Sequence, residues 1–198
     1  MKKILAFLAL SIALIAPSHA DVLYTNSANF LAHTSAGFTN TFTGAEISPP
    51  GSYSSGAFAY TLSAAGGLYS NGDFIGTNLP NDALTITFTG APVTAIGGNF
   101  YATNISDIFQ SVAITATLSN GTSTTYTPGS TATFRGVTTD LAITSLILSA
   151  PGAGLYVGLD NFFVGTAAVT STVPEPASLG LLGAGLIGLA AMRRRRAA

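Results

Sequence analysis

The sequence predicts an all-β domain of two packed antiparallel sheets, a jelly-roll-like sandwich. Residues 21–173 are rich in Thr, Ser, Gly, Phe, Tyr and Val and nearly free of Lys, Glu and Arg, a composition that favours strands and turns. Apolar and polar residues alternate in several short segments, as in half-buried strands. Gly, Pro and Asn recur between these segments and predict turns. The range is long enough for one domain with a sizeable core.

Two segments show the alternation most clearly. Leu84, Ile86 and Phe88 fall on one side of a predicted strand at 84–89. Residues 112–118 alternate in the same way, and the turn at 119–121 leads into a partner strand at 122–127, which predicts a hairpin. Further strands are expected at 38–43, 57–63, 93–100, 131–135, 142–149 and 155–164. A short helix capped by Ser27 is expected within residues 21–36.

The first twenty residues have the three regions of a secretory signal peptide. Two lysines precede an apolar run at residues 4–16, and the small-residue site Ser18-His19-Ala20 follows a proline. We expect signal peptidase to cleave between Ala20 and Asp21. The alternative is a retained membrane helix, which the short run and the proline after it disfavour.

The last residues combine three features in a fixed order. A Pro-Glu-Pro motif is followed by an uncharged apolar run at 177–192 and then by four arginines. A helix over the apolar run would reach roughly 24 Å, short of a bilayer core of about 30 Å, so a marginal transmembrane helix is expected. The arginines predict that the carboxyl end stays in the cytoplasm. The motif is Val173, Pro174, Glu175 and Pro176, and the basic stop is Arg193, Arg194, Arg195 and Arg196.

This arrangement resembles the PEP-CTERM sorting signal of bacterial exosortase substrates. The resemblance implies recognition by a membrane-embedded exosortase, cleavage near residues 173–176 after transit through the membrane, and delivery of the preceding domain to the surface or extracellular matrix. The host it implies is a Gram-negative, often exopolysaccharide-producing bacterium. It divides the chain into a signal peptide at 1–20, an ectodomain at 21–170 and a sorting signal at 171–198. The alternative is an ordinary tail anchor with a stiff proline spacer.

The ectodomain carries a second resemblance. Residues 84–88, 95–100, 134–137 and 157–163 resemble parts of the β-sandwich ectodomains often found before such tails. This resemblance implies a jelly-roll-like fold and no particular ligand.

Between its two ends the chain is acidic. Residues 21–173 contain seven acidic residues and Arg135 as the one basic residue, a net charge of −6, although the whole chain carries −1. Proteins that bind nucleic acid present basic surfaces to the phosphates, so nucleic acid is excluded as a partner. The chain has no cysteine, which excludes disulfides, thiol catalysis and thiolate metal sites.

No enzyme is expected. His33 is the one histidine after the predicted leader, and no Gly-x-Ser-x-Gly motif accompanies it, so an acyl-transfer triad is not indicated. A glycosidase needs two carboxyl groups that converge on the substrate, and Glu46 is the one glutamate of the domain. The aspartates lie near turns, where Asp commonly bonds its own backbone. A polysaccharide hydrolase is therefore only the second alternative.

Two kinds of binding site remain as alternatives. No cofactor is expected, but Ca²⁺ prefers Asp, Asn and carbonyl oxygens, so Asp160 and Asn161 are one candidate site for a structural calcium ion. Carbohydrate binding is the other, since exposed tyrosines stack on sugar rings. The remaining turn candidates for calcium are 71–73 and 81–82, and the tyrosines considered for stacking are Tyr53, Tyr60, Tyr69 and Tyr101.

Together these features predict an exported, non-enzymatic protein of the cell surface or biofilm matrix, associated with exopolysaccharide. The first alternative is a carbohydrate-binding module. The scarcity of lysine in the sheets also leaves pairing between the edge strands of two copies open.

Overall fold

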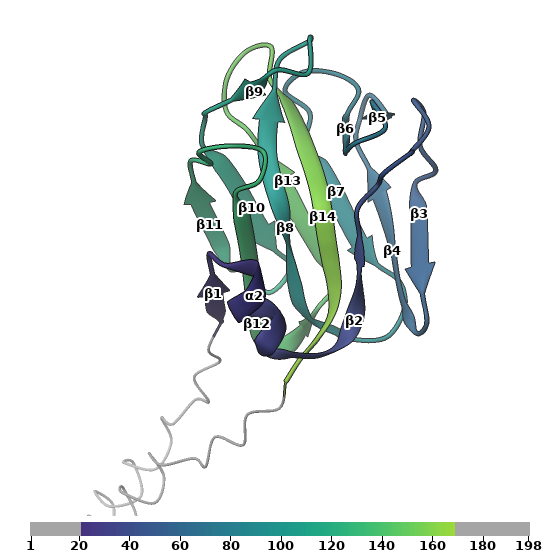
Figure 1. The fold of residues 1–198 in the computed structure, drawn as a ribbon, viewed down its shortest axis with the longest axis vertical. Helices are drawn as coiled ribbons and strands as arrows, with labels where there is room; N and C mark the ends of the chain where they lie inside the picture. Colours follow the sequence, from purple (N-terminus) through teal and green to yellow (C-terminus); the bar gives the residue numbers. More distant parts are fainter. Residues whose placement is uncertain (1–20, 169–198) are drawn as a thin grey trace, which may run out of the picture. The chain divides into compact units, whose positions relative to one another are not determined.

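The all-β prediction is confirmed by the computed structural model, which describes residues 21–168. Two antiparallel sheets pack face to face, and one short helix lies outside them (Figure 1). Every described strand pairs with another strand of the same range, so this range holds both sheets of one domain. The predicted leader, the sorting motif and the predicted terminal helix lie outside the described residues.

The first sheet contains the central strand of the domain, β14, which has neighbours on both sides. Its order is β1-β12-β8-β14-β6-β5, while β2 pairs with β14 and β9 pairs with β8. The strands span Val22–Tyr24 (β1), Thr34–Asn40 (β2), Leu68–Ser70 (β5), Ile75–Thr77 (β6), Val93–Thr103 (β8), Phe109–Gln110 (β9), Phe134–Ile143 (β12) and Tyr156–Ala167 (β14).

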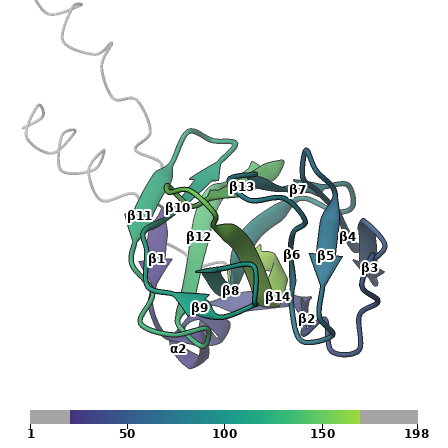
Figure 2. The same ribbon diagram turned by 90° about the horizontal axis from the view of Figure 1, so that it is seen from above.

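The second sheet has the order β11-β10-β13-β7-β4-β3. Figure 2, which looks down on the domain from above, shows the two sheets as separate layers. The two-sheet sandwich is thus established, while the jelly-roll-like arrangement of its strands stays a prediction. The strands span Ser52–Ser55 (β3), Phe58–Ser63 (β4), Leu84–Phe88 (β7), Ile114–Leu118 (β10), Ser123–Tyr126 (β11) and Ser145–Ser149 (β13).

Alternation along the strands places every second residue between the sheets. Leu84, Ile86 and Ile114 are fully buried there, while the threonines between them lie on the outer face. The predicted hairpin is confirmed, because β10 pairs with β11 across a tight turn with Thr115 opposite Thr125. The alternation of apolar and polar residues therefore predicted correctly which side of these strands faces the core.

One predicted strand is wrong, and several short strands were not predicted. Residues 142–149 do not form one strand, because β12 ends at Ile143 and β13 begins at Ser145 in the other sheet. The strand predicted at 131–135 is β12, which begins only at Phe134 and runs on to Ile143, inside the strand predicted at 142–149. The unpredicted strands β1, β3, β5, β6 and β9 are each four residues or shorter, which is too short for alternation to be recognised.

The predicted helix exists, but its cap is Asn26 and not Ser27. Helix α2 spans Ser27–Ala32, and the Asn26 side chain accepts a hydrogen bond of 2.9 Å from the backbone N–H of Asn29. Asparagine and serine are equally good N-caps, so the sequence alone did not show which of these adjacent residues caps the helix. The predicted cap was therefore one residue too late.

Helix α2 docks on the outer face of the first sheet through Phe30, which is fully buried. A Cβ atom added at Gly97 or Gly136 would lie 3.0 Å or 2.7 Å from the Phe30 ring. Glycine at these two positions therefore makes the trough that the ring fills. Tyr24 and Phe163 complete this cluster around Phe30.

The two ends of the sandwich differ in what they carry. At the near end β1 begins and β14 ends, since register pairs connect Val22 through Thr138 and Ala95 to Gly165. At the opposite, far end β8 stops and β14 begins, close to β5, β6 and β9 (Figure 1). The first and last described residues therefore both lie at the near end of the sandwich, and neither covers the far end. Within residues 21–168 no helix has the length and hydrophobicity to cross a membrane.

Candidate functional site

Of the residues predicted to take part in processing, Asp21 is the one that the structure describes. Its carboxylate accepts hydrogen bonds from the hydroxyl of Thr122 and from Asn120 Nδ2, the latter at 3.1 Å. These bonds hold the start of the domain against the turn between β10 and β11. Ala20 and residues 173–176 and 193–196 lie outside the described residues.

Asp160 and Asn161 form a β-bulge in β14, where the register with β8 shifts. Asn161 has a φ of 50°, a conformation that Asn tolerates better than most residues. The Asp160 carboxylate accepts hydrogen bonds from the backbone N–H of Asn161 at 2.6 Å and from its Nδ2 at 2.7 Å. Burial raises the pKa of Asp160, the Asn161 N–H opposes this rise, and the charge of Asp73 adds to it. The pair thus has a local structural role.

The other two calcium candidates also bond the backbone, Asn71 within a local turn and Asp82 across sixteen positions of the chain. Asn71 Oδ1 accepts a hydrogen bond of 3.0 Å from the backbone N–H of Asp73, and Asp82 Oδ2 accepts one of 2.6 Å from that of Gly66. In the part of the chain that the structure describes, no three His, Cys, Asp or Glu residues gather as a metal site would require. A structural calcium ion therefore stays a prediction.

Three of the four tyrosines considered for sugar stacking point elsewhere. Tyr60 is fully buried in the core, and Tyr53 packs against it with a ring-centroid distance of 5.4 Å. Tyr101 is 4% exposed and packs edge-on against Phe74, with a ring-centroid distance of 5.6 Å. Tyr69 is different, because it lines an open pocket at the far end of the sandwich.

This far-end pocket has a volume of about 150 Å³ and joins the loops after β6 and β8 to the start of β14. Its walls combine aromatic rings, side-chain amides and one carboxylate. Such a mixture of stacking surfaces and a few placed polar groups is typical of small-ligand sites. The lining residues are Tyr69, Phe74, Thr77, Asn78, Thr103, Asn104, Ile105, Asp107 and Tyr156.

Asp107 is the carboxylate of the far-end pocket, and its position is fixed by its neighbours. Tyr69 Oη donates a hydrogen bond of 2.8 Å to Asp107 Oδ2, and Asn71 Nδ2 donates a second of 3.3 Å to the same atom. Both bonds end on Oδ2, so Oδ1 remains to accept a hydrogen bond from a ligand. The hydrogen bond to Asp107 raises the pKa of Tyr69, with burial adding to it, so the phenol stays protonated as a donor.

The loop that carries Asp107 is held by Asn104. Asn104 Oδ1 accepts hydrogen bonds from the backbone N–H groups of Ser106 at 2.9 Å and Ile108 at 3.1 Å. This leaves the Asn104 amide nitrogen to donate. Ile105 and Ile108 project from the same loop with 79% and 60% of their surface exposed, which is unusual for isoleucine and gives the far end an apolar rim.

The far end is also negatively charged. Burial raises the pKa of the Tyr101 phenol, and the nearby charges of Asp160, Asp107 and Asp73 raise it further. Three carboxylates therefore act on one region, and the one basic residue of the range, Arg135, does not line the far-end pocket. The pocket consequently favours neutral or cationic ligands over anions.

Of the residues that line this pocket, the sequence had indicated Tyr69, as a stacking candidate, but not Asp107, Asn78, Asn104 or Tyr156. These residues come from segments that lie far apart in the sequence, so sequence spacing could not predict that they line one pocket. One local signal was present: Asn104 followed by Asp107 between two strands is typical of an Asx turn.

The residues weighed for catalysis lie apart from this pocket. His33 Nδ1 donates a hydrogen bond of 2.8 Å to the carbonyl oxygen of Asn29 at the end of α2. Glu46 is exposed in the loop between β2 and β3. Asp107 is the one carboxylate among the residues that line the far-end pocket.

Comparison with known proteins identifies the end of the chain. Residues 172–196 match the family model of the PEP-CTERM protein-sorting motif. No curated protein and no solved structure matches the chain.

The described residues thus define a class, a two-sheet β domain with a polar and aromatic pocket at its open end. The matched motif adds the particular feature, because the chain carries a PEP-CTERM sorting signal after this domain. The resemblance predicted from Val173-Pro174-Glu175-Pro176, the apolar run and the arginines is therefore confirmed. The motif points to an exported protein that an exosortase processes.

Proposed function

We propose that this protein is a non-enzymatic constituent of the surface or extracellular matrix of a Gram-negative bacterium, where it associates with exopolysaccharide. The observation that carries the proposal is the sorting motif at residues 172–196. Signal peptidase removes the leader, so that the protein begins at Asp21. The terminal helix then holds the protein in the membrane during transit, and an exosortase cleaves near the motif. The folded domain is what remains at the surface.

The shape of the domain supports this role. Its last described residue, Ala168, is bound at the near end, where its backbone N–H donates a hydrogen bond of 2.8 Å to the carbonyl oxygen of His33. The sorting motif begins four residues later along the chain. The far-end pocket lies at the opposite end of the sandwich, so attachment through the carboxyl end leaves it open to the surroundings.

Carbohydrate binding is the second candidate function, and the far-end pocket favours it. In this function the Tyr69 and Tyr156 rings that line the pocket stack on a sugar ring, while Asp107 Oδ1 and the amides of Asn78 and Asn104 bond vicinal hydroxyl groups. The negative charge of this end favours a neutral or amino-bearing sugar over a uronate or a sulfated sugar. A hydrolase is not supported, because a single lining carboxylate does not make the pair that glycoside hydrolysis requires.

Intact-mass measurement of protein recovered from the producing cells tests the sorting proposal. The expected masses begin at Asp21 and end near residues 173–176. Substitution of Glu175→Ala should leave the tail uncut, whereas Glu46→Gln, far from the motif in sequence, should be processed normally. Recovery of a tail that still ends at Ala198 in cells with an active exosortase would contradict the proposal.

Affinity electrophoresis in gels that contain neutral, amino-bearing or acidic polysaccharides tests the carbohydrate proposal. The protein should be retarded by a neutral or amino-bearing polymer, and Asp107→Asn should abolish the retardation. Asp82→Asn is the control, since Asp82 bonds a backbone N–H outside the pocket. Retardation by acidic polymers alone, or equal retardation of Asp107→Asn, would rule out the far-end pocket as the site.

A further inference from the structure

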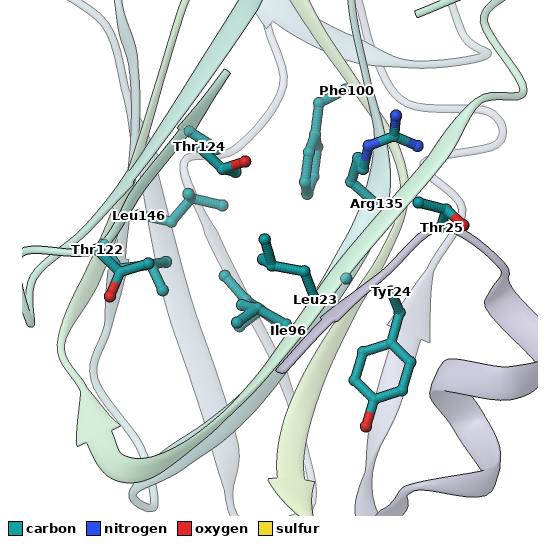
Figure 3. Close-up of a pocket in the computed structure, with 13 residues that line it drawn as sticks. Leu23, Tyr24, Thr25, Ile96, Phe100, Thr122, Thr124, Arg135 and Leu146 are labelled. Carbon is teal, nitrogen blue, oxygen red and sulfur yellow. The ribbon is translucent and has the colours of Figure 1, made fainter. Parts of the chain in front are cut away.

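A second hollow, the edge cavity, lies between the two sheets where their edge strands β1 and β11 face each other. It has a volume of about 110 Å³. Figure 3 shows Leu23, Ile96 and Phe100 on one side of it, Thr122, Thr124 and Leu146 on the other side, and Arg135 beside Phe100 at its rim.

The edge cavity exists because the sandwich is not closed along this side. Leu23 pairs with Val137, a core residue, and therefore shares its side of the sheet, yet Leu23 is 55% exposed. On the second sheet, Ala116 lies opposite Thr124, and both side chains are short. Apolar walls that enclose unfilled space lose dispersion contacts, so an apolar group of matching size gains them by entering.

Arg135 supplies the second feature of the edge cavity. It lies two residues before Val137 on β12 and so points to the same inner side of the sheet. Its guanidinium carbon lies 4.2 Å from the centroid of the Tyr126 ring, and Nη1 donates a hydrogen bond of 2.9 Å to the carbonyl oxygen of Phe134. Tyr126 is itself held by a hydrogen bond of 2.9 Å from its Oη to the carbonyl oxygen of Phe100.

These contacts position the guanidinium without neutralising it. A ring face and one carbonyl group use only part of its five N–H donors, and among the described residues its recorded partners include no carboxylate. Residues 21–168 contain seven acidic side chains and no other basic one. The single cation of an acidic domain therefore stands at the rim of an apolar cavity, turned toward the inside of the sandwich.

We propose that the edge cavity binds a small amphiphilic carboxylate, a short-chain aliphatic acid. Its chain fills the space between Leu23, Ile96 and Leu146, and its carboxylate pairs with the Arg135 fork, a geometry that guanidinium groups favour. The small volume admits a short chain and excludes a long one. This site is independent of the far-end pocket and of the sorting motif.

The test is calorimetric titration of residues 21–168, which hold both complete sheets, with butanoate, hexanoate and dodecanoate. Hexanoate should bind more tightly than butanoate by about fourfold per added methylene, and dodecanoate should gain nothing further. Hexylamine and hexanol are the control ligands, and neither should bind measurably. Binding of hexanol as tight as that of hexanoate, or no heat with any carboxylate, would overturn the proposal.

Two substitutions separate the charge from the cavity. Arg135→Gln should weaken hexanoate binding by about ten- to hundredfold, the range expected for a lost hydrogen bond to a charged group, while Arg135→Lys should retain part of it. Ala116→Leu should fill the cavity and abolish binding without lowering the unfolding temperature. If Ala116→Leu does not fold, Thr124→Leu on the edge strand makes the same test, and its unchanged affinity for hexanoate would overturn the proposal.

Discussion

The far-end pocket and the edge cavity are two hollows of one sandwich with opposite chemistry. The first is lined by aromatic rings, amides and the carboxylate of Asp107. The second has aliphatic walls and the guanidinium of Arg135. In a domain with so few charged residues, the carboxylates near the far-end pocket and the lone guanidinium at the edge cavity decide which ligands each hollow admits.

Their positions explain the difference. The far-end pocket is made by loops, where side-chain oxygen atoms bond the backbone and polar residues gather, as Asn104 shows. The edge cavity lies between two sheets, where alternation delivers mostly apolar side chains, with threonines from the edge of the second sheet and Arg135 among them. Loops therefore give this domain a hydrophilic site, and an incompletely closed sheet edge gives it a hydrophobic one.

The largest expected effect is the loss of stability in Phe30→Ala. This substitution should also disturb β1, which forms a wall of the edge cavity and not of the far-end pocket. Phe30→Ala should lower the free energy of unfolding by about 3–5 kcal/mol, because it empties a fully buried site. Tyr24 loses its partner ring, β1 loosens, and the Leu23 wall of the edge cavity moves. Chemical denaturation should show the loss, with Leu31→Ala on the exposed side of α2 as the control. Unchanged hexanoate binding in Phe30→Ala would contradict this link.

The next effect is a crossed pair of substitutions. Asp107→Asn should weaken binding of the neutral or amino-bearing polysaccharide by about ten- to hundredfold and leave hexanoate binding unchanged. Arg135→Gln should do the reverse. Titration of both variants with both ligands measures this, and a loss of both affinities in either single variant would show that the hollows are not independent.

A smaller effect is expected from Tyr69→Phe. This change removes the 2.8 Å hydrogen bond to Asp107 and keeps the ring, so the carboxylate is freed to rotate while the stacking surface remains. We expect about a tenfold weaker affinity for the polysaccharide, as for one hydrogen bond to a charged group. Tyr156→Phe, whose ring also lines the pocket, is the matched comparison, and an effect as large there would mean that the bond to Asp107 is not what matters.

The smallest effect concerns pH. The pKa of Asp160 is raised, mainly by burial, so the folded domain holds this proton at pH values where the unfolded chain has lost it. Stability should therefore fall as the pH rises through the window that begins near the ordinary Asp pKa of about 3.9. Unfolding temperatures measured from about pH 3 upward should show this fall in the wild type and less of it in Asp160→Asn. Equal slopes would exclude Asp160 as the titrating group.

Much of the fold was predictable because its strands obey local rules. Leu84, Ile86 and Ile114 alternate with threonines, and Asn120-Gly121 marks the hairpin that follows. The break between Ile143 and Ser145 was not predictable, because the apolar pattern continues while the chain changes sheet. Such a crossing depends on which strands are neighbours in space, and alternation does not contain that information.

The sites were predictable only in part, for a similar reason. Tyr69 was among the candidates because exposed tyrosines on the faces or loops of a β-sandwich can stack on sugar rings. Its partner Asp107 lies thirty-eight positions away, and only the fold brings them together. Arg135 was noticed as the sole basic residue, but its inward direction follows from its register next to Val137 and was not apparent from composition.

The central place of β14 has a mechanical consequence. This strand leads directly to the carboxyl end of the domain and is bonded along its length to β8 on one side and to β2 and β6 on the other. A pull on Ala168 along the strand axis would load these hydrogen bonds together in shear instead of opening them one after another. Resistance to forced unfolding is set by the unfolding rate, so loading these bonds together should slow the unfolding of the domain when force acts on Ala168.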